Sequence, residues 1–198
     1  TARRELIRST VPGPTVAVPP VARTADTVEG RARDPSRGVF ARWRPPPGVI
    51  TVVSDTHGTD GHRLTGRTLQ AVREADLVIH AGDFTTEAVL DAFESEADRL
   101  VAVAGNNEKA GVRERLGSER VVERAGVRIL VVHGHEHDRT ALNLHGRQEG
   151  ADLIVVGHSH RPGVDRSGAA AVLNPGSHAD PRRYRPGHAE LEPTGEGL

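Results

Sequence analysis

Five short polar clusters in this sequence carry residue types that bind metal ions. Each follows an apolar run, and they are Ser54-Asp55-Thr56-His57-Gly58, His80-Ala81-Gly82-Asp83, Gly105-Asn106-Asn107-Glu108, His133-Gly134-His135 and Gly157-His158-Ser159-His160. They supply carboxylate, amide and imidazole donors without sulfur, a set that suits Mn²⁺, Zn²⁺, Fe or Ni better than a soft metal. Ordinary turns also use Asp, Asn and Gly, but they have no need of His. Five such clusters in series therefore favour a metal site over turn chemistry.

The apolar runs and the periodic segments between the clusters predict the elements that position them. The expected strands are residues 49–53, 77–79, 100–104, 119–124, 127–132, 153–156, 163–165, 170–173 and 188–192. The expected helices are residues 63–74, 86–98, 109–116 and 139–149. Every cluster then follows the carboxyl end of a strand, the edge at which open α/β sheets bind ligands. We expect the clusters to meet in one site of an α/β protein with two sheets, with hairpins at 119–132 and 163–173.

Composition narrows the class of protein. A chain of 198 residues suits one domain, or one domain with a tail, better than two full domains. Only 3% of the residues are aromatic, so the core must be aliphatic. The absence of Cys excludes disulfides, Cys-ligated metal sites and cysteine nucleophiles. A formal net charge of −1 removes the simplest argument for a polyanion-binding protein.

Charge and proline divide the chain into a tail and a domain. Residues 1–48 hold nine Arg, four acidic residues and eight of the 13 prolines, whereas the remainder holds 17 basic and 23 acidic residues. We expect residues 1–48 to be a disordered extension, 49–192 the domain and 193–198 a short C-terminal tail. The basic extension is either a nucleic-acid arm or, as we favour, a solvated segment. No run resembles a signal peptide or a membrane span, which indicates a soluble, cytoplasmic protein.

The order and spacing of the five clusters resemble those of the calcineurin-like metallophosphoesterases, most closely their small, capless phosphodiesterase branch. The match runs from about Val49 to Leu191. It implies a four-layer αββα sandwich of two mixed β-sheets flanked by helices. It also implies two metal ions and seven ligands. Those ligands are Asp55, His57 and His160 for the first metal, Asn106, His133 and His158 for the second, and Asp83 as the bridge.

The expected reaction follows from that metal centre. Two divalent cations, with Mn²⁺ favoured and Ni²⁺, Zn²⁺, Fe or Mg²⁺ as alternatives, would activate a bridging hydroxide for in-line attack on phosphorus. No protein nucleophile is then needed. His135 could touch the phosphate or orient His133, whereas we expect His137 and His145 to be solvent-exposed. Residues 174–177 either line the site, as the resemblance implies, or form an ordinary Pro-Gly turn.

One position departs from the wider family. Much of that family has His where this chain has Asn107, and that His is thought to protonate the leaving oxygen. An amide cannot do so, and therefore the general acid is unassigned. The small phosphodiesterase branch also lacks this His, so the departure favours phosphodiesters over monoesters as substrates.

Three functions compete. The favoured one is a phosphodiesterase acting on a small phosphodiester, either as a single chain or as a homo-oligomer. The second is a non-catalytic scaffold that binds proteins, because a retromer subunit shares this fold and has lost metal-site residues. The third is a nuclease that uses the basic arm. The complete ligand set favours an enzyme over a scaffold, and the small core disfavours a nuclease.

Overall fold

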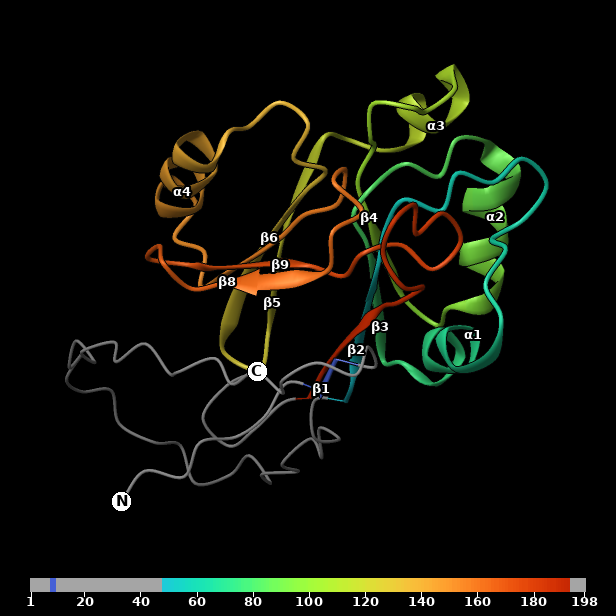
Figure 1. The fold of residues 1–198 in the computed structure, drawn as a ribbon, viewed down its shortest axis with the longest axis horizontal. Coiled ribbons are helices and arrows are strands. Elements are labelled where there is room, and N and C mark those ends of the chain that lie inside the picture. The colour runs from blue at the N-terminus through green and yellow to red at the C-terminus, as the bar shows by residue number, and fades with distance from the viewer. Residues whose placement is uncertain (1–7, 10–47, 193–198) are drawn as a thin grey trace, which may run out of the picture.

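The computed structural model describes Arg8–Ser9 and residues 48–192, of which the first pair is described by its backbone alone (Figure 1). Nearly all of the predicted extension 1–48 and the tail 193–198 lie outside these residues. The backbone of Arg8–Ser9 does belong to the fold, since it forms an edge strand of one sheet. Among the described residues, none of the helices is long and apolar enough to cross a membrane.

The first sheet has five strands in the order β1-β10-β2-β3-β4. Their bounds are β1 Arg8–Ser9, β10 Ala189–Leu191, β2 Ile50–Val53, β3 Leu77–His80 and β4 Leu100–Ala102. Strands β2, β3 and β4 are parallel, whereas β10 runs antiparallel to both β2 and β1. The parallel trio places the ends of β2, β3 and β4, and the polar clusters that follow them, at one edge of the sheet.

The second sheet has the order β5-β6-β7-β9-β8. Its strands are β5 Glu119–Arg124, β6 Val127–Val132, β7 Leu153–Val155, β9 Ala171–Asn174 and β8 Gly163–Asp165. Strands β6, β7 and β9 are parallel, and the two predicted hairpins, β5 with β6 and β8 with β9, are antiparallel. The clusters at 133–135 and 157–160 therefore share the carboxyl edge of this sheet.

Alternating side chains on the buried strands divide the core into three zones. In β6, Ile129 and Val131 face the first sheet and belong to the core between the sheets, whereas Leu130 and Val132 face outward. That outer face is covered by α4 (Arg139–Gln148) through Leu142. The period-2 alternation of a strand thus gives each sheet two apolar faces.

Three helices cover the outer face of the first sheet (Figure 1). They are α1 Gly66–Glu74, α2 Glu87–Glu96 and α3 Ala110–Arg115. Phe93 of α2 and Val112 of α3 are fully buried against this face. The layers therefore run helix, sheet, sheet, helix, which confirms the expected four-layer αββα architecture.

Candidate metal centre

The seven predicted ligands lie together at the carboxyl edges of the two sheets. The first sheet supplies Asp55, His57, Asp83 and Asn106 from the loops after β2, β3 and β4, and the second supplies His133, His158 and His160 from the loops after β6 and β7. Two sets within them have ligand atoms that all lie within 4.8 Å of one another. Those sets are Asp55, His57 and His160, and Asp55, Asp83 and His133.

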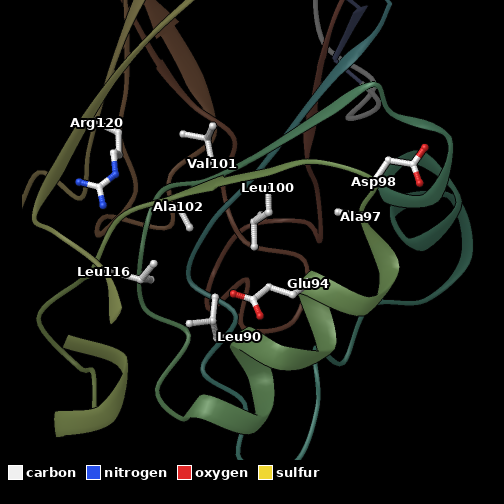
Figure 2. A pocket seen from close by; sticks show the side chains of 9 residues that line it. All are labelled: Leu90, Glu94, Ala97, Asp98, Leu100, Val101, Ala102, Leu116 and Arg120. Carbon is white, nitrogen blue, oxygen red and sulfur yellow. The ribbon is translucent and has the colours of Figure 1, made fainter. Parts of the chain in front are cut away.

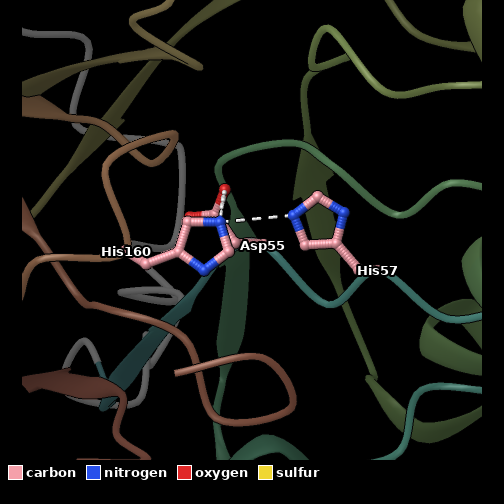
Figure 3. Close-up of side chains that lie close together, drawn as sticks. All are labelled: Asp55, His57 and His160. Carbon is pink, nitrogen blue, oxygen red and sulfur yellow. Dashed lines mark hydrogen bonds and ion pairs between the residues drawn. The ribbon is translucent and has the colours of Figure 1, made fainter. Parts of the chain in front are cut away.

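The first set forms one side of the site (Figure 3). Nε2 of His57 lies 3.3 Å from Nε2 of His160, and the two rings stack with their centroids 5.1 Å apart. Nε2 of His160 also lies 3.5 Å from Oδ1 of Asp55. Donor atoms at these separations can all reach a single transition-metal ion, since its bonds to nitrogen and oxygen are about 2.0–2.2 Å long.

The second side is built around Asn106. Its side-chain oxygen lies 3.1 Å from Nε2 of His133 and 3.1 Å from Nδ1 of His158. The rings of His133 and His158 meet at 74° with centroids 5.4 Å apart. One amide oxygen and two imidazole nitrogens therefore converge on a second point.

Asp83 joins the two sides. Its Oδ2 lies 3.5 Å from Nε2 of His57 on the first side and 3.3 Å from Nε2 of His133 on the second. The residue is only 1% exposed. A buried carboxylate between two donor groups has the position that a bridging ligand requires.

The backbone around the site is held in an unusual conformation. Five of the seven candidate ligands have positive φ angles, and they are Asp55, His57, Asp83, His158 and His160. Non-glycine residues adopt this region rarely, and such strain clusters at functional sites. Close approach also explains Gly105, since a Cβ there would lie 2.1 Å from Oδ1 of Asp83.

Hydrogen bonds fix which nitrogen of two histidines faces the site. Nδ1 of His133 lies 2.7 Å from the carbonyl oxygen of Ala81, and Nδ1 of His160 is bonded to the carbonyl oxygen of Asp180. A carbonyl oxygen can only accept, so each Nδ1 carries the proton. Each Nε2, which faces the other donors, is then free to bind a metal ion.

Burial and charge set the protonation of the two aspartates. Burial works to raise the pKa of Asp83, but His133 and the N–H groups of Asn107 outweigh it and hold that pKa well below its usual range. Burial raises the pKa of Asp55, and the hydroxyl of Ser54 opposes this effect. The Asp83 carboxylate is therefore ionised throughout the ordinary pH range.

Asn107 and Glu108 support Asp83 from the loop after β4. The backbone N–H and the side-chain amide of Asn107 both donate to the Asp83 carboxylate. The Glu108 carboxylate is buried and accepts from the backbone N–H groups of Phe84, Thr85 and Gly105. Its two oxygens are thus occupied by three backbone N–H groups.

Three further histidines, His135 and His137 in the loop after β6 and His145 on α4, divide into two groups. The ring of His135 lies 5.4 Å from that of His133 and 6.1 Å from that of His158, beside the second side of the site. The prediction that His137 and His145 are solvent-exposed is wrong, because both are partly buried. Their rings stack 5.3 Å apart, and Nε2 of His145 lies 3.0 Å from Oε2 of Glu119. They pack against each other beyond the site, because the loop turns back onto α4.

Sequence reasoning missed the supporting role of His80. This residue ends β3 and is fully buried, with its ring stacked on Phe84. Its Nδ1 accepts from the N–H of Gly82, so its Nε2 carries the proton and donates to Oγ1 of Thr56. It thereby ties the loop after β2 to the loop after β3. Only its place at the end of an apolar run before Gly82 and Asp83 could have signalled this role.

The last residue of β9 and the loop that follows it also support the site. The hydroxyl of Ser177 donates to the backbone carbonyl of Asp55, and the amide of Asn174 donates to the carbonyl of Gly157. Residues 174–177 therefore hold two ligand-bearing loops in place.

A pocket of about 390 Å³ lies elsewhere, between α2 and β4 (Figure 2). Leu90, Leu100 and Leu116 line it together with Glu94 and Arg120. None of the seven candidate ligands lines this pocket, so it is separate from the metal centre.

The donor set fits a pair of divalent cations. His133 and His160 each offer an unprotonated Nε2, because their proton is on Nδ1. An ionised carboxylate lies between the two sides, and Asn106 adds one amide oxygen. Nitrogen and oxygen donors without sulfur suit Mn²⁺, Zn²⁺, Fe and Ni²⁺. The residues present therefore match what a metal-dependent hydrolase needs.

Comparison with known proteins agrees with this geometry. Residues 49–193 match the model of the calcineurin-like phosphoesterase superfamily domain. A probable metallophosphoesterase of Methanocaldococcus jannaschii is 34% identical over 139 residues, which cover 68% of this chain and 70% of that protein. A phosphodiesterase of the same organism is 26% identical over 138 residues, which cover 64% of this chain and 82% of that protein.

The fold is also found in a solved structure. A variant of Vps29 from Entamoeba histolytica superposes with a TM-score of 0.60 at 23% identity, covering 73% of this chain and 85% of that one. The family model spans the domain that carries all seven candidate ligands. The chain therefore belongs to the calcineurin-like phosphoesterase superfamily.

Proposed function

We propose that this protein is a metal-dependent phosphodiesterase with a dinuclear metal centre, and that residues 49–192 are its catalytic domain. The observation that carries the proposal is the position of Asp83, whose Oδ2 lies 3.5 Å from His57 on one side of the site and 3.3 Å from His133 on the other. Asp55, His57 and His160 would hold the first ion, and Asn106, His133 and His158 the second. Mn²⁺ is the metal we propose, and the mixed nitrogen and oxygen donors are compatible with it.

The metal pair would supply two things when bound, a water of lowered pKa and positive charge against the phosphoryl oxygens. The residues of this chain supply the rest. The carbonyl oxygens of Ala81 and Asp180 keep His133 and His160 oriented with Nε2 toward the other donors, where it would be available to the ions. Asn107 and His133 keep Asp83 ionised, so that one carboxylate can serve both ions.

His135 is the side chain we assign to the substrate phosphate. Its ring lies beside His133 and His158, and its side chain is 27% exposed. A partly exposed imidazole at this place can donate a hydrogen bond to a phosphoryl oxygen. Asn107 cannot act as a general acid, and its amide is already bonded to Asp83.

Diesters are the proposed substrates because the leaving group receives no proton from position 107. The phosphodiesterase of M. jannaschii supports this choice as a relative. The fold shared with Vps29 keeps a protein-binding scaffold as the alternative. The complete set of donors supports the enzyme, since a scaffold has no need of them.

Hydrolysis of bis(p-nitrophenyl) phosphate and of p-nitrophenyl phosphate tests the proposal. Metal-free protein should be inactive, and Mn²⁺ should restore diester hydrolysis with much slower monoester hydrolysis. Asp83→Asn should lower diester turnover by at least about 1000-fold, because the bridging charge is lost. Asp98→Asn, an exposed aspartate in the pocket between α2 and β4, is the matched control and should retain activity. Metal-independent turnover, or full activity in Asp83→Asn, would contradict the proposal.

A further inference from the structure

Two exposed arginines are tied to the backbone of the metal centre. Nη1 of Arg63, in the loop between β2 and α1, donates to the carbonyl oxygen of His57 at 3.3 Å. Nη2 of Arg113, on α3, donates to the carbonyl oxygen of Asn106 at 3.0 Å. His57 belongs to the first side of the centre and Asn106 to the second. One guanidinium is therefore anchored beside each side.

Of the 16 arginines in residues 48–192, Arg63 and Arg113 are the two whose side chains donate to a backbone carbonyl of a candidate metal ligand. Six arginines there form ion pairs with carboxylates, and they are Arg67, Arg73, Arg115, Arg128, Arg139 and Arg182. Within the same residues, neither Arg63 nor Arg113 lies within 4.0 Å of a carboxylate oxygen. Their positive charge is thus not neutralised by a neighbouring acid.

Both guanidinium groups also keep N–H groups that are not used in these hydrogen bonds. A guanidinium has five N–H groups, and a single carbonyl oxygen engages only part of that capacity. Its planar fork matches the oxygens of a phosphate, which it can bind with two parallel hydrogen bonds. Lys109, the residue before α3, is a further exposed cation without an ion pair in the described residues.

The nearby acidic groups form no ion pair with either guanidinium in the described residues. Asp60 accepts a hydrogen bond from the hydroxyl of Thr59, and the carboxylate of Glu87 lies against the backbone of Gly111 in α3. Beyond residue 48 the chain holds 17 basic and 23 acidic residues, so positive charge at this edge is not a property of the whole surface. Uncompensated cations in an acidic domain indicate an anionic ligand.

We propose that Arg63 and Arg113 bind a second anionic group of the substrate, so that the natural substrate is a small phosphodiester that carries an additional phosphate. This inference rests on the proposed function, since it assigns the scissile phosphate to the metal centre and the additional phosphate to the arginines. The tethers to His57 and Asn106 hold the guanidinium groups near the centre without making them ligands. They determine which diester binds, whereas the metal centre determines which bond breaks.

Two chromogenic diesters with the same leaving group separate these roles. One is the p-nitrophenyl ester of thymidine 5′-monophosphate, and the other is the same compound with a 3′-phosphate. In the Mn²⁺-loaded full chain, we expect kcat/KM to be about tenfold higher for the phosphorylated compound, mainly through KM. The preference should shrink as salt is added, because these cations are exposed.

Substitution tests whether the two arginines cause the preference. Arg63→Gln and Arg113→Gln should each lower the ratio of the two kcat/KM values, and the double variant should bring it to within about twofold of one. Arg99→Gln is the matched control, since Arg99 is exposed, has no ion pair in the described residues and lies at the opposite end of β4. It should retain the full ratio.

Calorimetry gives a readout that does not depend on turnover. Thymidine 3′,5′-bisphosphate should bind the Mn²⁺-loaded protein about tenfold more tightly than thymidine 5′-monophosphate, and the double variant should lose that difference. Equal affinity for the two nucleotides, or an equal loss of affinity for both in the double variant, would overturn the inference and leave the arginines a structural role. A protein that hydrolyses neither ester but binds the bisphosphate through the arginines would contradict the proposed function alone.

Discussion

Asn107 donates a hydrogen bond to each oxygen of the Asp83 carboxylate. Its backbone N–H donates to Oδ1 at 2.9 Å, and its side-chain amide donates to Oδ2 at 2.7 Å. The family resemblance implies a proton-donating His at this position in much of the wider family. In this chain Asn107 instead orients Asp83, the carboxylate that we propose as the bridging ligand.

Removing the amide should weaken metal binding. Asn107→Ala leaves Oδ2 of Asp83 without its shortest hydrogen bond, and loss of such outer partners lowers metal affinity by about 10–100-fold. Titration of the metal-free protein with Mn²⁺ measures this effect. Asn143→Ala, on α4 beyond the site, is the control and should bind Mn²⁺ as the wild type does. Unchanged Mn²⁺ affinity in Asn107→Ala would show that Asp83 does not depend on the amide.

Because position 107 holds no general acid, kcat should depend steeply on the pKa of the leaving group. Aryl diesters with leaving-group pKa values from about 7 to 10 should lose about 100-fold or more in kcat, because a positioned general acid contributes about 10²–10⁴-fold. The series is measured at saturating Mn²⁺ on the wild type and on His135→Gln. A shallow dependence that becomes steep in His135→Gln would identify His135 as the acid and contradict the prediction.

Glu108 should be a stabilising residue of the fold. Glu108→Ala leaves three backbone N–H groups without their acceptor in a buried loop, and we expect a loss of about 2–5 kcal/mol in the free energy of unfolding. Glu108→Gln keeps one oxygen, and Oε1 of Glu108 alone serves Phe84 and Gly105, so it should recover at least half of the loss. Urea denaturation measures both, with the exposed Glu114→Ala as control. A loss no larger than that of Glu114→Ala would contradict this role.

His80 should make stability depend on pH. Burial lowers its pKa well below 6.5, so the folded protein keeps it neutral while the unfolded chain takes up a proton below that pH. Proton uptake on unfolding makes the free energy of unfolding fall as the pH drops below about 6.5, by at most about 1.4 kcal/mol per pH unit for this group. The contribution is fully present above pH 6.5.

The substitution His80→Asn isolates the contribution of His80 to the pH dependence of the free energy of unfolding. Its side-chain oxygen can accept from Gly82 as Nδ1 of His80 does, but it does not titrate. Urea unfolding of metal-free protein between pH 7.5 and 5.5 should show a shallower loss of stability in His80→Asn than in the wild type. The opposing effect of His133, whose pKa is raised by Asp83 against the effect of burial, is present in both proteins and cancels. Parallel curves would contradict the assignment.

Much of the fold is readable from the sequence because its buried strands are short apolar runs, separated by amphipathic helices or by turns. Strands β5 and β6 begin and end where the apolar pattern predicts, and the four helices lie within their expected ranges. The pairing of Arg8–Ser9 with β10 is not predictable, because two residues in a Pro- and Arg-rich stretch have no pattern. Only the partner strand gives them a β conformation.

The candidate ligands of the site were predictable from the sequence, whereas the residues that support them were not. His and Asp at strand ends identify Asp55, His133 and the other candidate ligands, but sequence does not reveal what supports them. The contacts of Glu108 with three N–H groups and of Asp180 with His160 use backbone atoms, which every residue has. The stacking of His137 on His145 depends on a loop turning back onto α4. Such contacts follow from tertiary structure and leave no local signal.

Crystals of the protein grown with Mn²⁺ would show whether Asp83 bridges two metal ions. We expect two anomalous difference peaks about 3.5–4 Å apart, both in contact with the Asp83 carboxylate. One peak should also touch His57 and His160, and the other Asn106 and His158. A single peak, or two peaks of which one does not contact Asp83, would contradict the dinuclear centre.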